Sequence, residues 1–492
     1  MTGAFRAQWE LRAAFARRMA ATYGREVPAY LTLVDVAADV NAEVVARDGA
    51  SAVRLGSIER VTAERHGAVR VGTPDELRVV ARIFGALGMH PVGWYDLREA
   101  ARSAVPVVST AFRPVAADEL ARNPFRMFTS MLVTDDRRFF SAELQSRLEA
   151  FLGRRTLFPP ELLALADRSV AAGGLDADEA VRFLELATAS FALSDEPIDR
   201  AWYAELEAVS AVAADIGGLS STHINHLTPR VLDIDALYWQ MQARGIAMID
   251  AIQGPPSWHG PDVLLRQTSF RALDERRAFR EADGSVVPGA LRVRFGEVEA
   301  RGIALTPAGR DRYDAMLGEV DARLAARRNG ASTVGTPSGE VRQEVAAKVW
   351  ADRLPATELG LLRDGLAYFT FELAAAADRV CAATPFVPPP ERARSGELGA
   401  TERQRIAGLV GAGVLTATPI VYEDFLPRSA AGIFQSNLTG DGSKDSSVAG
   451  ARRDAGWLAG VLDAEVADPH ALYAAQQQAS ITALSRELVG PC

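Results

Sequence analysis

Residues 64–77, ERHGAVRVGTPDEL, join a short β-like run to the start of a helix, and this junction sets the fold. Thr73 can cap the helix, Pro74 suits the first helical position, and Glu76 can complete a capping box. The helix is expected to stop at Gly88. Three further strand-like runs follow, at residues 90–97, 105–115 and 124–133. The predicted order is strand, helix, strand, strand, strand.

A second region repeats this order and some of its details. His66 and His226 each precede a helix cap by seven positions and an arginine by four. Residues 110–113, TAFR, are echoed by residues 268–271, TSFR. Such self-similarity indicates an internal duplication. The expected elements of this second region are strands at residues 223–232, 246–254, 262–273 and 290–300 and a helix at residues 234–244.

The duplication predicts an α+β protein built on paired βαβββ modules with large helical insertions and additions. Leu-, Ala- and Glu-rich helical patterns occupy residues 142–214 and 306–383, and residues 386–399 form a Pro- and Gly-rich loop. The predicted organisation is a helical segment (1–56), a first module (57–140), a helical insertion (141–215), a second module carrying most metal ligands (216–305), a helical region (306–400) and a C-terminal segment (401–492).

Composition and charge narrow the possible functions. The chain has 492 residues and a net charge of −9, which disfavours binding to nucleic acid or an anionic membrane surface. It lacks a signal-peptide pattern and an apolar run of the ~18–20 residues that span a bilayer, so a cytoplasmic protein is predicted. Its two cysteines, Cys381 and Cys492, do not make a thiolate zinc site, so a metal would need His, Asp or Glu ligands.

His66 and His226 occupy matching positions on the first strands of the two modules. If the modules pack about a pseudo-twofold axis, these strands approach each other and both imidazoles can converge on one metal ion. The last strand of the second module supplies a carboxylate, and periodicity does not choose between Glu297 and Glu299. The matching position in the first module falls near Ser130, a weak ligand. Two histidines and one carboxylate suit Fe(II) oxygenases, although Zn²⁺ or Mn²⁺ could bind the same set.

Nearby polar residues have both structural and functional interpretations. Arg70 lies an even number of positions beyond its histidine, so it could hold a carboxylate or a developing negative charge beside a metal. Arg230 follows Pro229, which interrupts the strand, so a structural ion pair is the alternative. His223 lies an odd number of positions from His226, so we assign it to packing or supporting hydrogen bonds.

The chain resembles the 2-oxoadipate dioxygenase/decarboxylase family, also called hydroxyglutarate synthase, of the vicinal oxygen chelate superfamily. The resemblance extends from about residue 26 to near the C-terminus, and paired βαβββ modules forming a sheet or half-barrel are typical of that superfamily. It rests on residues 64–73 (ERHGAVRVGT), 222–236 (THINHLTPRVLDIDA), 264–270 (LLRQTSF), 293–302 (VRFGEVEARG), 304–310 (ALTPAGR) and 421–438 (VYEDFLPRSAAGIFQSNL).

The resemblance implies that 2-oxoadipate, an oxo-diacid of lysine breakdown, reacts with O₂ to give D-2-hydroxyglutarate and CO₂. It implies that His66, His226 and Glu297 hold Fe(II), which favours Glu297 over Glu299. It also implies that Arg70 is the catalytic arginine. All four residues are then expected to lie at the bound substrate.

The resemblance further implies that Arg428 and Ser429 bind the far carboxylate of the substrate. Residues 421–438 would then form a loop that closes over the substrate and donates backbone N–H groups and a hydroxyl to an anion, although composition alone favours a solvated acidic turn. At the position of Arg428 the family commonly has a small apolar residue, so its guanidinium could add an anion clamp or change the preferred substrate length.

Two alternatives remain open. One is a metal-dependent isomerase or hydrolase of the same superfamily, which would not consume O₂. The other is a non-catalytic ligand-binding protein, which would not depend on bound iron.

Overall fold

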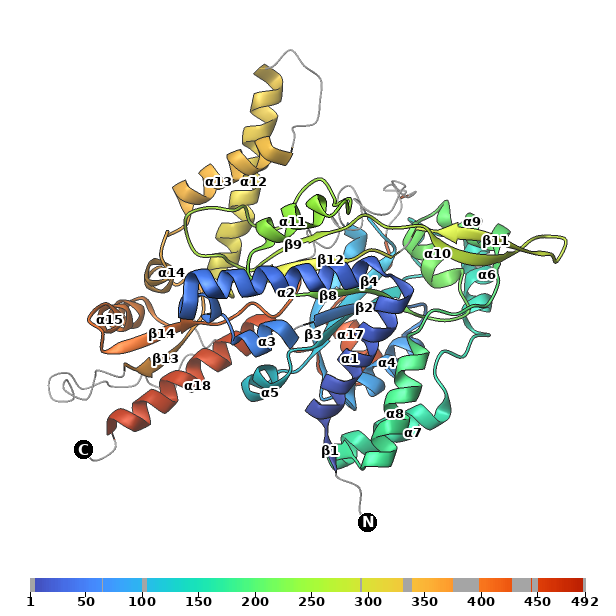
Figure 1. The fold of residues 1–492 in the computed structure, drawn as a ribbon, viewed down its shortest axis with the longest axis horizontal. Helices are drawn as coiled ribbons and strands as arrows, with labels where there is room; N and C mark the ends of the chain where they lie inside the picture. The colour runs from blue at the N-terminus through green and yellow to red at the C-terminus, as the bar shows by residue number, and fades with distance from the viewer. Residues whose placement is uncertain are drawn as a thin grey trace.

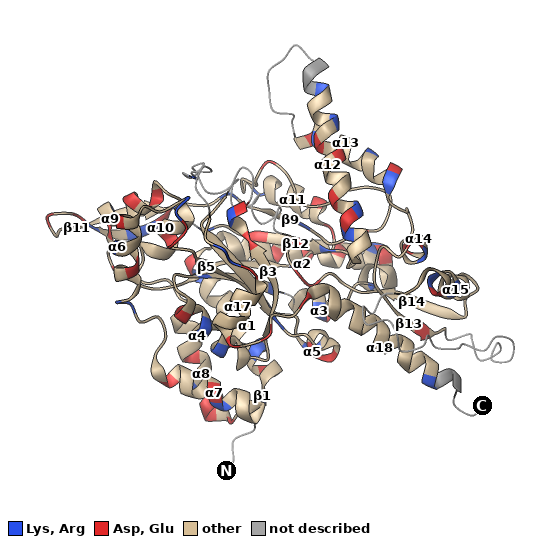
Figure 2. Ribbon diagram, turned by 180° about the vertical axis from the view of Figure 1, so that it is seen from behind, with Lys and Arg blue, Asp and Glu red and all other residues tan. Residues whose placement is uncertain are grey.

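The computed structural model describes residues 5–63, 65–99, 104–292, 294–330, 339–374, 398–426, 444 and 450–489. Within these residues the fold is mixed α+β, with several small sheets surrounded by helices (Figure 1). None of the helices in these ranges combines the length and apolarity needed to cross a bilayer. Acidic and basic residues are interspersed along peripheral helices such as α12 and α13 (Figure 2).

The first predicted module forms four strands of a five-stranded sheet with the order β3-β4-β5-β2-β8. Strand β2 runs parallel to β5 and antiparallel to β8, so the first strand of the second region adds directly to this sheet. The predicted order of elements is present here as β2 (Arg65–Val71), α4 (Pro74–Gly85), β3 (His90–Asp96), β4 (Val107–Arg113) and β5 (Arg126–Leu132).

The start of α4 differs from the prediction in one contact. Thr73 caps the helix as expected, because its side chain accepts the amide N–H of Glu76 at 3.1 Å. The Glu76 carboxylate, however, accepts the N–H of Gly72, one residue before the cap, at 2.6 Å. It also pairs with Arg155, which draws it away from a regular capping box. The helix ends at Gly85 and the chain turns through Gly88, where φ is +67°.

The second region keeps the predicted order with three departures, of which one is the additional strand β10 (Glu275–Arg280). The expected strand at residues 246–254 is reduced to isolated bridges at Met248 and Gln253, before a bend at Gly254 with φ of +104°. The run at residues 290–300 is divided between two strands, since β11 ends at Leu291 and β12 begins at Glu297, just after Gly296. A Cβ at this position would lie 1.8 Å from the Phe270 ring. The elements are β8 (Ile224–Pro229), α11 (Ile234–Ala243), β9 (Leu265–Ser269), the hairpin of β10 (Glu275–Arg280) and β11 (Val286–Leu291), and β12 (Glu297–Arg301).

Strand β12 lies next to the junction of the two regions, which β2 and β8 form. It pairs antiparallel with β9, and an isolated parallel bridge between Arg230 and Glu299 joins it to the end of β8. Helix α1 supports the same place, because Tyr23 Oη donates to the carbonyl oxygens of Asn225 and Phe295 at 3.1 and 2.9 Å. Strands β2, β8 and β12 therefore lie side by side (Figure 1).

Helices cover this group of strands, largely where helical patterns were predicted. The N-terminal helices are α1 (Gln8–Glu26), α2 (Ala29–Asp48) and α3 (Ile58–Ala63), and α5 (Ala117–Arg122) lies between β4 and β5. The insertion contains α6 (Ala142–Leu152), α7 (Pro160–Ala172), α8 (Ala177–Ser190), α9 (Arg200–Glu207) and α10 (Ala211–Gly217). The later helices are α12 (Pro307–Gly330), α13 (Gly339–Arg353), α14 (Glu358–Arg363), α15 (Ala400–Gly411), α17 (Ala455–Leu462) and α18 (Pro469–Val489). Short elements complete the described fold: β1 (Arg6–Ala7), β6 (Gly174–Leu175), β7 (Ile198–Asp199), η1 (Gly49–Val53) and η2 (Leu97–Glu99).

One part of the predicted helical zone at residues 306–383 is a strand instead. Residues 369–373, FTFEL, form β13 (Phe369–Leu373), which pairs antiparallel with β14 (Leu415–Pro419). Phe369 and Phe371 are buried and alternate with more exposed residues, which is the pattern of a strand with one face in the core. The predicted loop at residues 386–399 lies mostly outside the described residues.

Candidate metal centre

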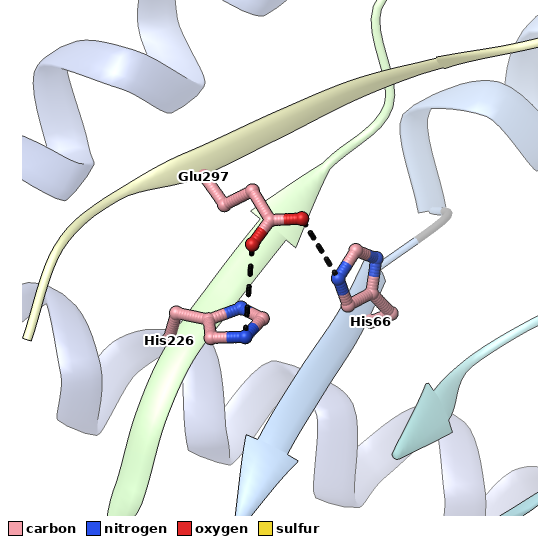
Figure 3. Close-up of side chains that lie close together, drawn as sticks. All are labelled: His66, His226 and Glu297. Carbon is pink, nitrogen blue, oxygen red and sulfur yellow. Dashed lines mark ion pairs between the residues drawn. The ribbon is translucent and has the colours of Figure 1, made fainter. Parts of the chain in front are cut away.

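Three side chains from three different strands converge in the core (Figure 3). Glu297 of β12 places Oε1 3.5 Å from Nε2 of His66 on β2, and Oε2 3.7 Å from Nε2 of His226 on β8. One possible ligand atom from each residue lies within 4.8 Å of the others, and all three residues are buried. Two donors that each bind one ion at about 2.1 Å are about 3–4 Å apart, so these separations suit a shared ion.

The register of the strands explains why the two imidazoles meet. Strands β2 and β8 are antiparallel, with Ala68 opposite His226, and the register shifts between Ala68 and Val69. The rings of His66 and His226 lie at right angles with centroids 5.4 Å apart. The His226 ring also stacks on Phe295, with centroids 5.6 Å apart and an interplanar angle of 16°. These packing contacts hold both buried rings in place.

The second nitrogen of each ring has its own polar neighbour. His66 Nδ1 lies 3.0 Å from Glu299 Oε2, a close contact that does not meet the geometry of a hydrogen bond. His226 Nδ1 lies 3.1 Å from the hydroxyl of Thr228. In both rings Nε2 is therefore the nitrogen turned toward Glu297. A metal-binding histidine has this arrangement, because a polar group at the other nitrogen orients the ring.

The charges of the centre also fit a cation. Burial opposes protonation of His66, but the Glu299 and Glu297 carboxylates outweigh it and raise the pKa of His66. Burial lowers the pKa of His226 well below its usual value, so this imidazole is neutral and its lone pair is available. Burial raises the pKa of Glu297 despite the nearby imidazole. A divalent ion would supply the positive charge that this buried carboxylate needs to ionise.

Glu299 shares a face with Glu297, as the strand periodicity predicted, but it has a different position. It lies behind His66, where Arg301 binds its two oxygens at 2.7 and 2.9 Å. Burial alone would raise its pKa, but the arginine and the imidazole hold the pKa of Glu299 well below its usual value. The geometry thus distinguishes the two carboxylates, which sequence periodicity could not do.

Arg70 lies near this centre and is held by a buried carboxylate. Its Nη1 donates to Asp215 Oδ2 at 2.5 Å, and both side chains are almost fully buried. Asn225 also donates to Asp215, at 2.9 Å. His223 lies 3.5 Å from the same carboxylate, and burial lowers the pKa of His223 to about 4. His223 therefore supports Asp215 and lies outside the cluster of possible ligands, as its position on the strand indicated.

Arg230, the counterpart of Arg70, has a different environment. Its Nη2 donates to the carbonyl oxygen of Leu55 at 3.0 Å, and its backbone bridges to Glu299. The similar sequence spacing of the two arginines therefore does not give them similar contacts.

The strand pairing changes which residue of the first module matches Glu297. In the first sheet Ala111 faces Phe128, and in the second pairing Ser269 faces Glu297. Because Ala111 and Ser269 are equivalent in the TAFR and TSFR runs, Phe128 is the counterpart of Glu297. Ser130 lies two residues further along the strand, beside Arg70, and its hydroxyl is 2.8 Å from that of Ser109. An apolar residue, rather than the weak ligand Ser130, therefore occupies the position that matches Glu297.

Residues 422–426 contribute contacts that sequence reasoning missed. The Phe425 ring packs edge-on against His66 and at an interplanar angle of 54° against Phe128, each with centroids 4.9 Å apart. Just before it, Asp424 forms a buried two-bond pair with Arg113. The acidic residues at positions 423–424 are the only sequence signal for these contacts, and their composition is more typical of a solvated turn. The predicted substrate-binding residues Arg428 and Ser429 lie outside the described residues.

Comparison with known proteins gives consistent matches along the whole chain. Residues 15–437 match the family model described as 2-oxoadipate dioxygenase/decarboxylase. A Mycobacterium tuberculosis protein of that name is 52% identical over 95% of this chain and 97% of its own length. One from Pseudomonas putida is 39% identical over 97% of both chains. The crystal structure of hydroxyglutarate synthase from Pseudomonas putida with 2-oxoadipate has a TM-score of 0.80 at 36% identity, covering 98% of this chain and 99% of the other.

Proposed function

Because this chain belongs to the 2-oxoadipate dioxygenase/decarboxylase family, we propose that it converts 2-oxoadipate and O₂ to 2-hydroxyglutarate and CO₂. The reaction balances without another reductant, since both atoms of O₂ are retained in 2-hydroxyglutarate, one in its new carboxylate and one in its hydroxyl group. The observation that carries the proposal is the buried cluster of His66, His226 and Glu297 in a chain 52% identical to a curated relative. By analogy with the family, the D-enantiomer would form and the reaction would serve lysine breakdown.

We further propose that the metal is Fe(II). Two histidines and one carboxylate are the ligand set preferred by non-haem Fe(II) oxygenases, and the three groups leave coordination positions for substrate. Bound Fe(II) would supply the reactivity toward O₂ that these side chains lack. The buried site limits the access of water, which favours a reaction with O₂ over hydrolysis.

Arg70 is the proposed catalytic residue. Its guanidinium belongs to the same buried site as His226 and would bind the carboxylate of the 2-oxo acid beside the metal ligands. Asp215 fixes one side of this guanidinium, which orients it before substrate arrives. Arg428 and Ser429 are proposed to bind the far carboxylate, on the strength of the resemblance alone.

The paired-module interpretation of the fold supports this site. The pairings give the order β3-β4-β5-β2 on one side and β8-β12-β9 on the other, with β2 and β8 adjacent at the centre. We interpret these as two copies of one βαβββ unit related by a pseudo-twofold axis. Equivalent strands then contribute the two histidines, while Glu297 and Phe128 make the two halves unequal.

Product analysis under ¹⁸O₂ tests the proposed reaction. Protein loaded with Fe(II) and given 2-oxoadipate should yield 2-hydroxyglutarate carrying ¹⁸O and unlabelled CO₂. Glu297→Gln should yield no product under the same conditions. An isomerase or hydrolase would give product without label and without a requirement for O₂, and a binding protein would give no product. Either result would refute the proposal.

A further inference from the structure

A closed circuit of buried contacts connects the candidate metal ligand His66 to residues 422–425. His66 Nδ1 lies 3.0 Å from Glu299, and Glu299 forms a two-bond pair with Arg301. The side chains of all three residues are at most 1% exposed. The contacts thus continue from the imidazole to a guanidinium that does not itself belong to the cluster of possible ligands.

Arg301 extends the circuit to the C-terminal part of the chain. Its Nη1 donates to the carbonyl oxygens of Tyr422 and Asp424 at 2.7 and 3.0 Å. Its guanidinium carbon lies 5.8 Å from the centre of the Phe425 ring. That ring packs edge-on against His66 with centroids 4.9 Å apart, which closes the circuit. One arginine side chain therefore bonds to a carboxylate on its own strand and to a segment more than a hundred residues later.

We propose that Arg301 is a positioning residue that couples metal binding at His66 to the placement of residues 422–425. This inference takes one premise from the proposed function, namely that a metal binds at His66. Arg301 holds Glu299 behind the imidazole and, with the same guanidinium, holds the backbone that carries Phe425. A shift of His66 on binding a metal is therefore transmitted to residues 422–425, and the placement of that segment feeds back on metal affinity.

The chemistry requires an arginine at this position. A guanidinium presents its donors in a planar fork, so it can bind both carboxylate oxygens and still donate to carbonyl groups at its edge. A lysine keeps the charge but offers a single donor group, so it cannot make all four contacts in the same plane. Groups that orient a metal-binding histidine typically change metal affinity by ~10–100-fold when they are altered.

Arg301→Lys and Glu299→Gln test the coupling without relying on turnover. Each apoprotein is titrated with Co(II) or Zn(II), and hydrogen exchange of the amides at residues 422–425 is measured with and without the metal. In the native protein the amides of Tyr422, Glu423 and Phe425 donate to Gly302, Tyr473 and Tyr95. Metal binding should slow their exchange. Both variants should bind metal about 10–100-fold more weakly and should lose this metal-dependent change in exchange.

An exposed pair provides the matched control. Arg147 binds both oxygens of Glu205 at 2.7 Å, with side-chain exposures of 49% and 41%, so Arg147→Lys should leave metal affinity and exchange unchanged. Native-like metal affinity together with retained coupling in Arg301→Lys and Glu299→Gln would overturn the inference. A general loss of stability would raise exchange throughout the sheet rather than remove the metal-dependent difference at residues 422–425, and would likewise overturn it. If the unaltered protein bound no metal, the proposed metal site would fail first, and the two failures are thereby distinguished.

Discussion

Replacing Asp424 with asparagine tests how firmly residues 422–425 are attached to the sheet. Arg113 Nε and Nη2 donate to Asp424 Oδ1 and Oδ2 at 2.8 and 3.1 Å, and both side chains are 1% exposed. Tyr473 Oη donates to the same carboxylate. Burial opposes ionisation, but Arg113 and the hydroxyl outweigh it and lower the pKa of Asp424. The pair is therefore charged at neutral pH.

The substitution should lower the free energy of unfolding, because it leaves the charge of Arg113 buried without its partner. Asparagine keeps the size of the side chain but removes its charge, and breaking a buried pair in this way costs about 3–5 kcal/mol. Urea unfolding of the apoprotein, followed by tryptophan fluorescence, should show this loss in the free energy of unfolding. Folding lowers the pKa of the Asp424 carboxyl group from its unfolded value of 3.8. The contribution of the ionised carboxylate to stability is therefore complete above pH 3.8 and is lost as the pH falls below this value.

A less buried pair of the same chemistry is the control, since its arginine side chain is 19% exposed. Arg453 Nη2 lies 2.8 and 2.7 Å from the two oxygens of Asp135, whose side chain is 44% exposed. Solvent screens this pair, so Asp135→Asn should cost less than about 1 kcal/mol. If Asp424→Asn and Asp135→Asn lowered the free energy of unfolding equally, burial would not explain how much the Arg113–Asp424 pair contributes to stability.

Three further changes have defined outcomes. Arg70→Ala should still bind metal but lose turnover, because the proposed carboxylate contact is removed; undiminished activity in a steady-state assay would exclude a catalytic role. Phe128→Glu places a carboxylate at the position equivalent to Glu297, so Zn(II) titration should show tighter binding while O₂ uptake is lost; unchanged affinity would contradict the assigned register. The pKa of His223 is about 4 in the folded protein and 6.5 in the unfolded chain. Between these two pH values the unfolded chain therefore binds more protons than the folded protein. The free energy of unfolding should fall by about 3 kcal/mol from pH 6.5 to pH 4. His223→Gln should lose most of that dependence in urea unfolding at several pH values, and an unaltered slope would assign it to other groups.

The paired histidines could be found from sequence because each has the same spacing to a helix cap and to an arginine. Strand periodicity also identified both acidic candidates on β12, but it could not separate Glu297 from Glu299, which share a face. The structure separates them by their neighbours, since Arg301 lies beside one of them. The pattern of one strand carries no information about which side chains from other strands meet it.

Contacts from distant segments could not be predicted at all. Asp215 lies 145 positions from Arg70, and Asp424 lies 311 positions from Arg113. Neither acid has a periodicity or motif that connects it with its arginine. The assignment of Ser130 in place of Phe128 came from aligning two diverged runs without knowing their hydrogen-bond register. An alignment that is wrong by two positions places a residue on the same face of the strand, so the sequence pattern could not reveal the error.

Oxygen uptake on addition of 2-oxoadipate is the most direct test of the central claim. The unaltered protein loaded with Fe(II) should consume one O₂ for each CO₂ released, and 2-oxoglutarate and 2-oxopimelate would report the preferred substrate length. Protein carrying Glu297→Gln and treated in the same way should consume no O₂ above background. Release of CO₂ without oxygen uptake, or full uptake by the variant, would contradict the assignment of His66, His226 and Glu297 as the reactive metal centre.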